Sequence, residues 1–272
     1  MKLYYYSAGS NFGDAVNPYI LENIFGRKSV LAAPCDADLF MIGSILGKIL
    51  VRKSSIFKRL KMAFSSPLTI WSSGFIRDDV AGKCLSRNLN VCALRGELSL
   101  KLLEKISGQK FSPVLGDGGL LIAQLIKELP EKKYPVGIFP HFADENRPEI
   151  ALLQKKIPGS VVISPLGDPL ECARKIAECE TVISSSLHGL IASDSFGIPN
   201  RQIVISSNIK GGLFKYNDYY SAYKTQARPL VCNDVINNGI NADIIRADYR
   251  ISVDRVAEIK EQLIDSFPRE ME

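Results

Sequence analysis

Short apolar runs rich in β-branched residues alternate along this chain with longer segments whose apolar residues recur every three or four positions. The short runs are typical of buried strands, and the longer segments are typical of helices that cover a sheet. The expected strands are residues 3–6, 38–42, 68–71, 90–94, 113–115, 136–139, 161–164, 181–183 and 202–205. Strands that alternate with helices in both halves predict a doubly wound α/β fold with parallel sheets.

The expected helices follow most of these strands, and one more closes the chain. Asn17 and Pro18 are residue types that begin helices, and Gly26 is a type that ends them. Further helices are expected at residues 97–106, 168–179, from 187 onward and 253–267. The charged segment 127–134 is the expected boundary, which gives domains of residues 1–130 and 131–272, with the last helix packed back on the first domain.

Several expected strands end in small or polar residues. Ligands of open parallel sheets bind outside the carboxyl ends of the strands, where glycine lets the backbone approach closely. We therefore expect a ligand site lined by Gly43, Ser44, Gly74 and Asp117, with turn formation as the alternative role of Asp117. Arg95 is the strong cation among these strand ends. The apolar face of the next helix places it outside the expected core, and a structural salt bridge is its alternative role.

The segment 181–199 combines a strand, three serines and the start of a helix. Backbone N–H groups at such a helix start, together with the helix dipole, suit a phosphate or a carboxylate. The residues expected to bind this anion are Ser185, Ser186, Leu187 and Gly189. His188 lies in the first turn and adds a titratable group, with a hydrogen-bonded core histidine as the alternative.

Three other segments carry candidate chemistry. Asp14 lies with Asn11 on the expected loop between the first strand and the first helix, with capping of that helix as the alternative role. His141, the chain's other histidine, follows the strand at 136–139, with an unliganded loop residue as the alternative. Residues 210–220 contain a glycine turn followed by aromatic and charged residues without clear periodicity, which predicts a loop that closes over a polar ligand.

Composition narrows the protein class without fixing the function. The chain has 272 residues, 46% hydrophobic and 23% charged, as expected of a globular protein. A formal charge of +5 suits an anionic partner, but no basic tail indicates nucleic acid. Six cysteines without a CxxC pair, and an N-terminus without an apolar signal core, predict reduced thiols and a cytoplasmic location. No spacing of ligand residues predicts a metal, and no nicotinamide motif occurs.

Residues 48–64 carry six cations and no acid, with apolar residues interleaved at roughly helical spacing. This pattern is typical of a helix on an anionic membrane surface, but it favours the alternative of a solvated helix packed on its own domain. No apolar run approaches the roughly 20 residues that a membrane-spanning helix needs. Any membrane contact is therefore expected from one side, at the inner face of the plasma membrane.

Taken together, these motifs make the chain similar to members of the polysaccharide pyruvyl transferase family, of the bacterial exopolysaccharide ketal-pyruvyl-transferase type. The resemblance covers nearly the whole chain, and the order and spacing of its motifs carry it. The motifs are NFGD at 11–14 with NP at 17–18, IGS at 42–44, ALRGELS at 93–99, LGD at 115–117, FPH at 139–141, SSSLHG at 184–189 with GIP at 197–199, and FKYNDYY at 214–220.

The resemblance implies two Rossmann-like halves that face each other across a cleft, as in GT-B glycosyltransferases. It implies transfer of a pyruvyl group from phosphoenolpyruvate, as co-substrate and without other cofactor, to two hydroxyls of a lipid-linked sugar, giving a cyclic ketal. His188 would be the general acid, Asp14 the acceptor of a hydroxyl proton, and Arg95 the clamp for carboxylate or phosphate. The expected donor-binding residues are Ser185, Ser186, Leu187, Gly189, Lys215 and His141, and the expected acceptor side comprises Asn11, Gly43, Ser44, Gly74 and Asp117.

One position departs from the family pattern. Related chains often place arginine two residues before the histidine, where this chain has Ser186. Lys215 and Arg201 are the candidate replacement cations. Two other functions stay open: a GT-B glycosyltransferase that uses a nucleotide sugar, and a non-catalytic glycan-binding relative. The acceptor sugar, the stereochemistry of the ketal and the oligomeric state do not follow from the sequence.

Overall fold

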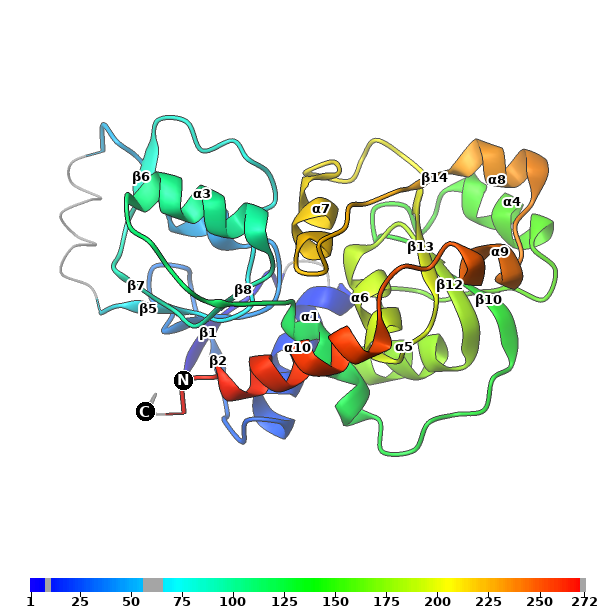
Figure 1. The fold of residues 1–272 in the computed structure, drawn as a ribbon, viewed down its shortest axis with the longest axis horizontal. Coiled ribbons are helices and arrows are strands. Elements are labelled where there is room, and N and C mark those ends of the chain that lie inside the picture. The colour runs from blue at the N-terminus through cyan, green and yellow to red at the C-terminus, as the bar shows by residue number, and fades with distance from the viewer. Residues whose placement is uncertain (8–10, 56–65, 270–272) are drawn as a thin grey trace.

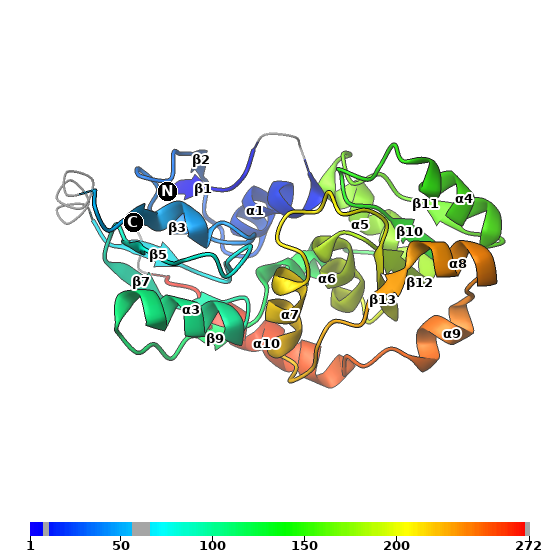
Figure 2. The same ribbon diagram turned by 90° about the horizontal axis from the view of Figure 1, so that it is seen from above.

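A computed structural model describes residues 1–7, 11–55 and 66–269 of the chain. Figure 1 shows two groups of strands, one built by the first half of the chain and one by the second, with helices around and between them. Figure 2 gives the view at right angles, in which α1 (Phe12–Asn23) and α7 (Phe214–Ser221) again lie between the two groups.

The first sheet has five parallel strands in the order β2-β1-β3-β5-β7. These strands are β1 (Lys2–Tyr4), β2 (Val30–Leu31), β3 (Leu39–Phe40), β5 (Leu68–Ile70) and β7 (Leu89–Val91). The second sheet also has five parallel strands, in the order β11-β10-β12-β13-β14. They are β10 (Tyr134–Phe139), β11 (Val161–Val162), β12 (Cys179–Ser184), β13 (Asn200–Val204) and β14 (Leu230–Val231).

Both sheets therefore have the same topology. With its strands numbered along the chain, each sheet reads 2-1-3-4-5, the order of a doubly wound sheet. The α/β fold with parallel sheets that the sequence predicted is confirmed. In this order the winding reverses between the first and third strands, and ligands bind at the carboxyl ends of those two strands, the topological switch point.

Helices and short strand pairs complete the fold. The other helices of the described residues are α3 (Glu97–Ser107), α4 (Pro148–Lys156), α5 (Pro169–Ala177), α6 (Leu187–Ser195), α8 (Cys232–Asn238), α9 (Ala242–Ala247), α10 (Val253–Asp265) and the 3-10 helices η1 (Leu46–Ile49) and η2 (Gly118–Leu125). Outside the two large sheets, β4 (Leu50–Arg52) pairs antiparallel with β6 (Lys83–Leu85), and β8 (Ala93–Leu94) pairs parallel with β9 (Val114–Leu115). Within the described residues, no helix has the length and apolar character needed to cross a membrane.

One apolar core joins the two sheets. Leu3 of the first sheet and Phe139 of the second belong to the same buried cluster. Helix α10 packs back on the first half of the chain, where the indole N–H of Trp71 donates to the carbonyl of Leu263 at 3.1 Å. The rings of Phe25 and Phe267 stack there, with 3.7 Å between centroids. The division of the chain at residues 130 and 131 stays a prediction.

Helix α1 begins at Phe12, so the prediction that it starts at Asn17 was wrong. The Asn11 side chain caps the helix by accepting from the N–H of Gly13 at 3.2 Å. Pro18 lies inside the helix, where it cannot donate to the carbonyl of Asp14. The Asn17 side chain donates to that carbonyl instead, at 2.9 Å. Asp14 therefore sits in the first helical turn and not on a loop.

Two other local predictions also differ from the structure. A loop was expected at residues 210–220, but residues 214–220 lie in α7, whose buried face carries Lys215, Tyr216 and Tyr219. The basic segment begins with the end of η1 and with the extended strand β4, so residues 48–52 are not α-helical as expected. Pairing with β6 holds this part of the backbone extended. Residues 56–64 of that segment lie outside the described residues.

Candidate functional site

The two switch points bring four predicted site residues to strand ends. In the first sheet, Asp14 follows β1 and Gly43 follows β3. In the second sheet, His141 follows β10 and His188 follows β12. Because these strands flank the point where the winding reverses, their carboxyl ends are where a doubly wound sheet binds ligands.

Helices α1 and α6 are in direct contact, so the two switch points lie next to each other. A Cβ atom added at Gly13 would lie 1.8 Å from Nδ1 of His188, so only glycine fits against the imidazole. Next to this contact, the rings of Phe12 and Phe139 meet edge to face, with 5.5 Å between centroids. The first half of the chain therefore forms part of the wall around a histidine of the second half.

Asp14 is a buried carboxyl at this junction. It accepts from the side-chain amide of Asn11, and a Cβ added at Gly43 would lie 3.1 Å from its Oδ1. Burial raises the pKa of Asp14 to about 7, while the charge of Lys215 and the Asn11 hydrogen bond oppose this rise. Near neutral pH, Asp14 therefore exchanges between its acid and base forms.

Lys215 brings a cation to the junction from α7. Its side chain is buried, and its Nζ lies 5.2 Å from the ring centroid of Tyr216. Nζ makes no hydrogen bond or ion pair within the described part of the chain. Burial, and then the charge of Arg95, lower the pKa of Lys215 to about 8, against the opposing charges of Asp14 and Asp144. With a buried side chain and no partner among the described residues, this ammonium is a candidate for binding an anion.

His188 and Asp117 each carry a buried polar atom that lacks a hydrogen-bond partner among the described residues, Nε2 and Oδ2 respectively. Both side chains lie close to Gly119, where an added Cβ would be 3.1 Å from Asp117 Oδ1 and 3.7 Å from His188 Cδ2. Unsatisfied polar atoms are uncommon in folded proteins. Two at one place suit a polar ligand that completes their hydrogen bonds.

Burial shifts both groups towards their neutral forms, but only His188 is mainly neutral at pH 7. Burial, followed by the charges of Arg95, Lys215 and His141, lowers the pKa of His188 to about 3. Burial raises the pKa of Asp117 to about 6, against the opposing charge of Arg95. His188 is therefore neutral at pH 7 while no anion is bound, and it can act as a cationic acid only if a bound anion raises its pKa.

Arg95 is fully buried, so the expectation that it lies outside the core was wrong. Its Nε pairs with Asp218 at 2.9 Å, and its Nη1 donates to the Ser44 hydroxyl at 2.6 Å. Its Nη2 donates to the carbonyl of Phe75, and Gly74 leaves room for the guanidinium, which an added Cβ would approach to 2.5 Å. Arg95 therefore has the alternative role, a structural salt bridge. Its side-chain nitrogens bind protein groups, and through Asp218 it holds the helix that carries Lys215.

The serine turn is held by another buried carboxylate. The Ser185 hydroxyl donates to Asp144 at 3.0 Å and accepts from the N–H of His141 at 2.8 Å. Ser186 is the N-cap of α6 but makes no side-chain capping bond, and the Leu187 side chain is buried. A ligand would meet this turn through backbone N–H groups rather than through the Leu187 side chain.

His141 stays near the site but is not charged there. Its ring packs against Phe142 with 4.4 Å between centroids, and its Nδ1 accepts from the N–H of Ala143 at 3.2 Å. Burial and the charge of Lys215 lower its pKa to about 4. Arg201, the other candidate cation, is paired with Asp248 in a different pocket. Lys215 is thus the candidate cation that the structure brings to the two switch points.

Sequence reasoning missed three residues that build the site. Gly13 admits the His188 ring, Asp144 holds Ser185, and Asp218 holds Arg95. Gly13 and Asp218 lie inside motifs quoted above, but only the fold reveals their partners. No three histidine, cysteine, aspartate or glutamate side chains are placed to hold a metal ion in the described ranges 1–7, 11–55 and 66–269.

Comparison with known proteins identifies the family to which the chain is similar. The family described as polysaccharide pyruvyl transferase matches residues 1–207. The succinoglycan biosynthesis protein ExoV of Rhizobium meliloti is 27% identical over 241 residues, which cover 84% of this chain and 67% of that protein. An uncharacterized protein of Acanthamoeba polyphaga mimivirus is 27% identical over 182 residues, 63% of each chain. The chain thus spans about two thirds of the length of these relatives, and no solved structure matches it significantly.

Proposed function

Because the chain belongs to the polysaccharide pyruvyl transferase family, we propose that it transfers a pyruvyl group from phosphoenolpyruvate to two hydroxyls of one sugar during exopolysaccharide biosynthesis. The observation that carries this proposal is the position of Lys215. It is a cation with a buried side chain and no partner within residues 1–7, 11–55 and 66–269, at the junction of the two switch points and next to the titrating Asp14. Phosphoenolpyruvate offers a carboxylate and a phosphate, either of which would neutralise this ammonium.

In the proposed reaction, the two acceptor oxygens form bonds to the central carbon of the donor, and the bond from that carbon to the phosphate oxygen breaks. Of the two hydroxyl protons released, one is balanced by the proton added to the methylene carbon and the other by protonation of the departing phosphate. The charge of the bound donor raises the pKa of His188, so that this residue delivers the proton to carbon. Asp14 in its base form accepts a hydroxyl proton.

Lys215 takes the place of the arginine that the family resemblance would put at Ser186. It holds the donor anion, while the backbone N–H groups at the start of α6 provide further hydrogen bonds. Arg95 does not clamp the donor in this proposal, since its guanidinium is bound by Asp218 and Ser44. Its role is to fix the position of α7.

For the fold, we propose a GT-B-like arrangement of residues 1–130 and 131–272, with the acceptor on the first half and the donor on the second. The shared topology of the two sheets and the contact between Gly13 and His188 support this arrangement. A donor-soaked crystal structure tests it, because phosphoenolpyruvate should lie against His188 and Lys215. Density for the donor elsewhere would contradict the proposed division.

For the acceptor, we propose a lipid-linked repeat unit presented at the inner face of the membrane, because residues 48–64 carry six cations and no acid. Liposome flotation should show binding to vesicles that contain anionic lipid, and reversal of charge at Lys58 and Arg59 should weaken it. Binding that is absent, or unchanged by this reversal, would count against a membrane contact through this segment.

Release of phosphate from phosphoenolpyruvate, measured against a panel of sugar acceptors, tests the proposed activity. Release that depends on both donor and acceptor, and that disappears in Lys215→Met, is the expected result. A thermal-shift experiment separates the alternative function, because a nucleotide diphosphate would stabilise a nucleotide-sugar enzyme while phosphoenolpyruvate would not. Stabilisation by the nucleotide alone would overturn the proposal.

A further inference from the structure

A separate pocket lies beside strand β13 and is lined by none of the residues proposed above to take part in catalysis. The start of β13 forms one wall, the segment 225–228 that leads to β14 forms another, and the segment 248–251 before α10 closes it. Its cavity volume is about 40 Å³, and its mouth opens to solvent. The pocket is therefore large enough for a small polar group and accessible from solvent.

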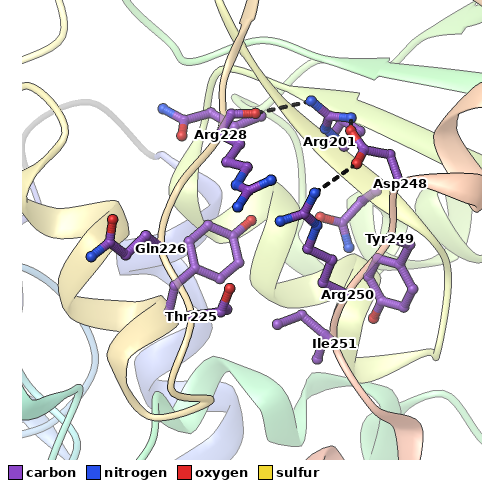
Figure 3. Close-up of a pocket in the computed structure, with 11 residues that line it drawn as sticks. Arg201, Thr225, Gln226, Arg228, Asp248, Tyr249, Arg250 and Ile251 are labelled. Carbon is purple, nitrogen blue, oxygen red and sulfur yellow. Dashed lines mark hydrogen bonds and ion pairs between the residues drawn. The ribbon is translucent and has the colours of Figure 1, made fainter.

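Three arginines gather in this pocket around one carboxylate. Figure 3 shows the side chains of Arg201, Arg228 and Arg250 converging beside Asp248. Asp248 pairs with Arg201 and, at 3.1 Å, with Arg250, and Arg201 also donates to the carbonyl of Arg228 at 3.0 Å. The guanidinium of Arg228 has no hydrogen bond or ion pair within the described part of the chain. The four side chains together leave two positive charges unbalanced.

A buried amide in the same pocket also lacks a partner. Gln202 is 4% exposed, and its Oε1 has no hydrogen bond among the described residues. Burial of an unsatisfied amide is costly unless something completes its hydrogen bonds. The two ends of a glutamine amide exchange by rotation, so Gln202 can present its NH₂ group to an anion. This observation is independent of the arginine cluster and also favours a polar ligand at this pocket.

We infer that this pocket binds a phosphate or diphosphate group. A guanidinium group can donate two parallel hydrogen bonds to two oxygens of one phosphate. A phosphate with two negative charges would also balance the two excess positive charges of the pocket. The group could belong to free phosphate or to the diphosphate of a lipid-linked sugar. Burial, with the neighbouring charges of Arg250 and Arg228, lowers the pKa of Arg201, as expected where cations are held together without their counterion.

Isothermal titration of the full chain with sodium pyrophosphate and with inorganic phosphate, at low ionic strength, tests this inference. The titrations use the Lys215→Met protein, so that anion binding at the candidate catalytic site does not contribute. In this background, Arg228→Gln should weaken binding about tenfold or more, the loss of one charge-assisted hydrogen bond. Arg250→Gln is a second variant, in case the first affects folding.

Arg174→Gln is the matched control, because Arg174 is also exposed and lies outside the pocket, on α5. It should leave the dissociation constant unchanged. Tighter binding of pyrophosphate than of phosphate would assign the pocket to a diphosphate, and equal binding would assign it to free phosphate. Absence of binding by both anions, or the same constant in Arg228→Gln and Arg174→Gln, would overturn the inference. Because Lys215 is removed throughout, neither outcome depends on the proposed transfer reaction.

Discussion

Replacement of Lys215 by methionine should make the protein more stable while it abolishes the proposed activity. The side chain is 7% exposed and its ammonium has no partner within the described residues. Its pKa falls from 10.5 to about 8, which corresponds to a cost of about 3 kcal/mol for the charged form in the folded protein. Methionine fills a similar volume without a charge, so the substitution removes this cost.

The pH dependence of the effect follows from the direction of the shift. Below pH 8 the lysine is charged in both the folded and the unfolded chain, so the full cost is present. Between pH 8 and pH 10.5 the folded protein releases the proton first, and the cost disappears as the pH rises. Asp14 changes the expected stability of the variant little. Its pKa is already about 7, so it takes up a proton when the neighbouring cation is removed and is not left as an unpaired charge.

Urea unfolding of the wild-type and Lys215→Met proteins at pH 7 and near pH 10 measures the difference. We expect the variant to be more stable by about 3 kcal/mol at pH 7, with the gap falling towards zero at the higher pH. Lys105→Met, at an exposed position of α3, should show no such gap. A variant less stable than wild type at pH 7, or a gain that does not change with pH, would refute the view of Lys215 as an uncompensated buried charge.

Three further substitutions test the surroundings of this cation. Gly13→Ala should displace the ring of His188 and lower donor-dependent phosphate release, because the new methyl group would lie 1.8 Å from Nδ1. Arg95→Met should cost about 3–5 kcal/mol in urea unfolding, because it leaves Asp218 buried without its cation. Asp14→Asn should lower kcat/KM about 100-fold or more and remove the loss of activity that wild type shows as the pH falls through about 7, where the base form is protonated.

Each of these substitutions has its own control. Gly47→Ala adds the same methyl group where no atom lies within 4 Å, so it should preserve activity. The double variant with Arg95→Met and Asp218→Asn should recover part of the lost stability, because it removes the stranded charge; no recovery would mean that Arg95 acts through packing alone. If the activity of Asp14→Asn still falls as the pH is lowered through about 7, the titrating group is another residue, such as Asp117.

Most strands of the two sheets could be predicted from the sequence because they are local apolar runs bounded by small or polar residues, whereas the two-residue edge strands β2 and β14 were not predicted. The strand at β12 and the helix at α6 follow directly from this pattern, with Ser186 at the junction. The start of α1 could not be predicted in the same way. Asn17 resembles a helix cap locally, but its side chain instead replaces the hydrogen bond that Pro18 cannot make, inside a helix that has already begun at Phe12.

The candidate site depends on contacts between residues far apart in the chain, so the sequence predicted its members better than their surroundings. The partner of Arg95 lies more than a hundred residues away, at Asp218, and no local pattern indicates that the pair is buried. Lys215 was expected to bind the donor and to be a candidate cation, but its burial was not predicted, since its segment lacks clear periodicity. Its burial arises because Asp218, one turn along the same helix, is pulled against the start of α3 by Arg95 and Ser99.

The choice of lysine for this cation has a chemical consequence that arginine would not have. An arginine at the Ser186 position would stay charged at any working pH, whereas burial brings the pKa of Lys215 to about 8. Asp14, with a pKa of about 7, is the opposing charge, so the pair is in its fully charged form only between these two values. A bound anionic donor would stabilise the ammonium and raise the upper value. At limiting donor concentration, the proposed activity should therefore decline above about pH 8. At saturating donor concentration it should persist to higher pH. If the activity declines over the same alkaline pH range under both conditions, a cation other than Lys215 binds the donor anion.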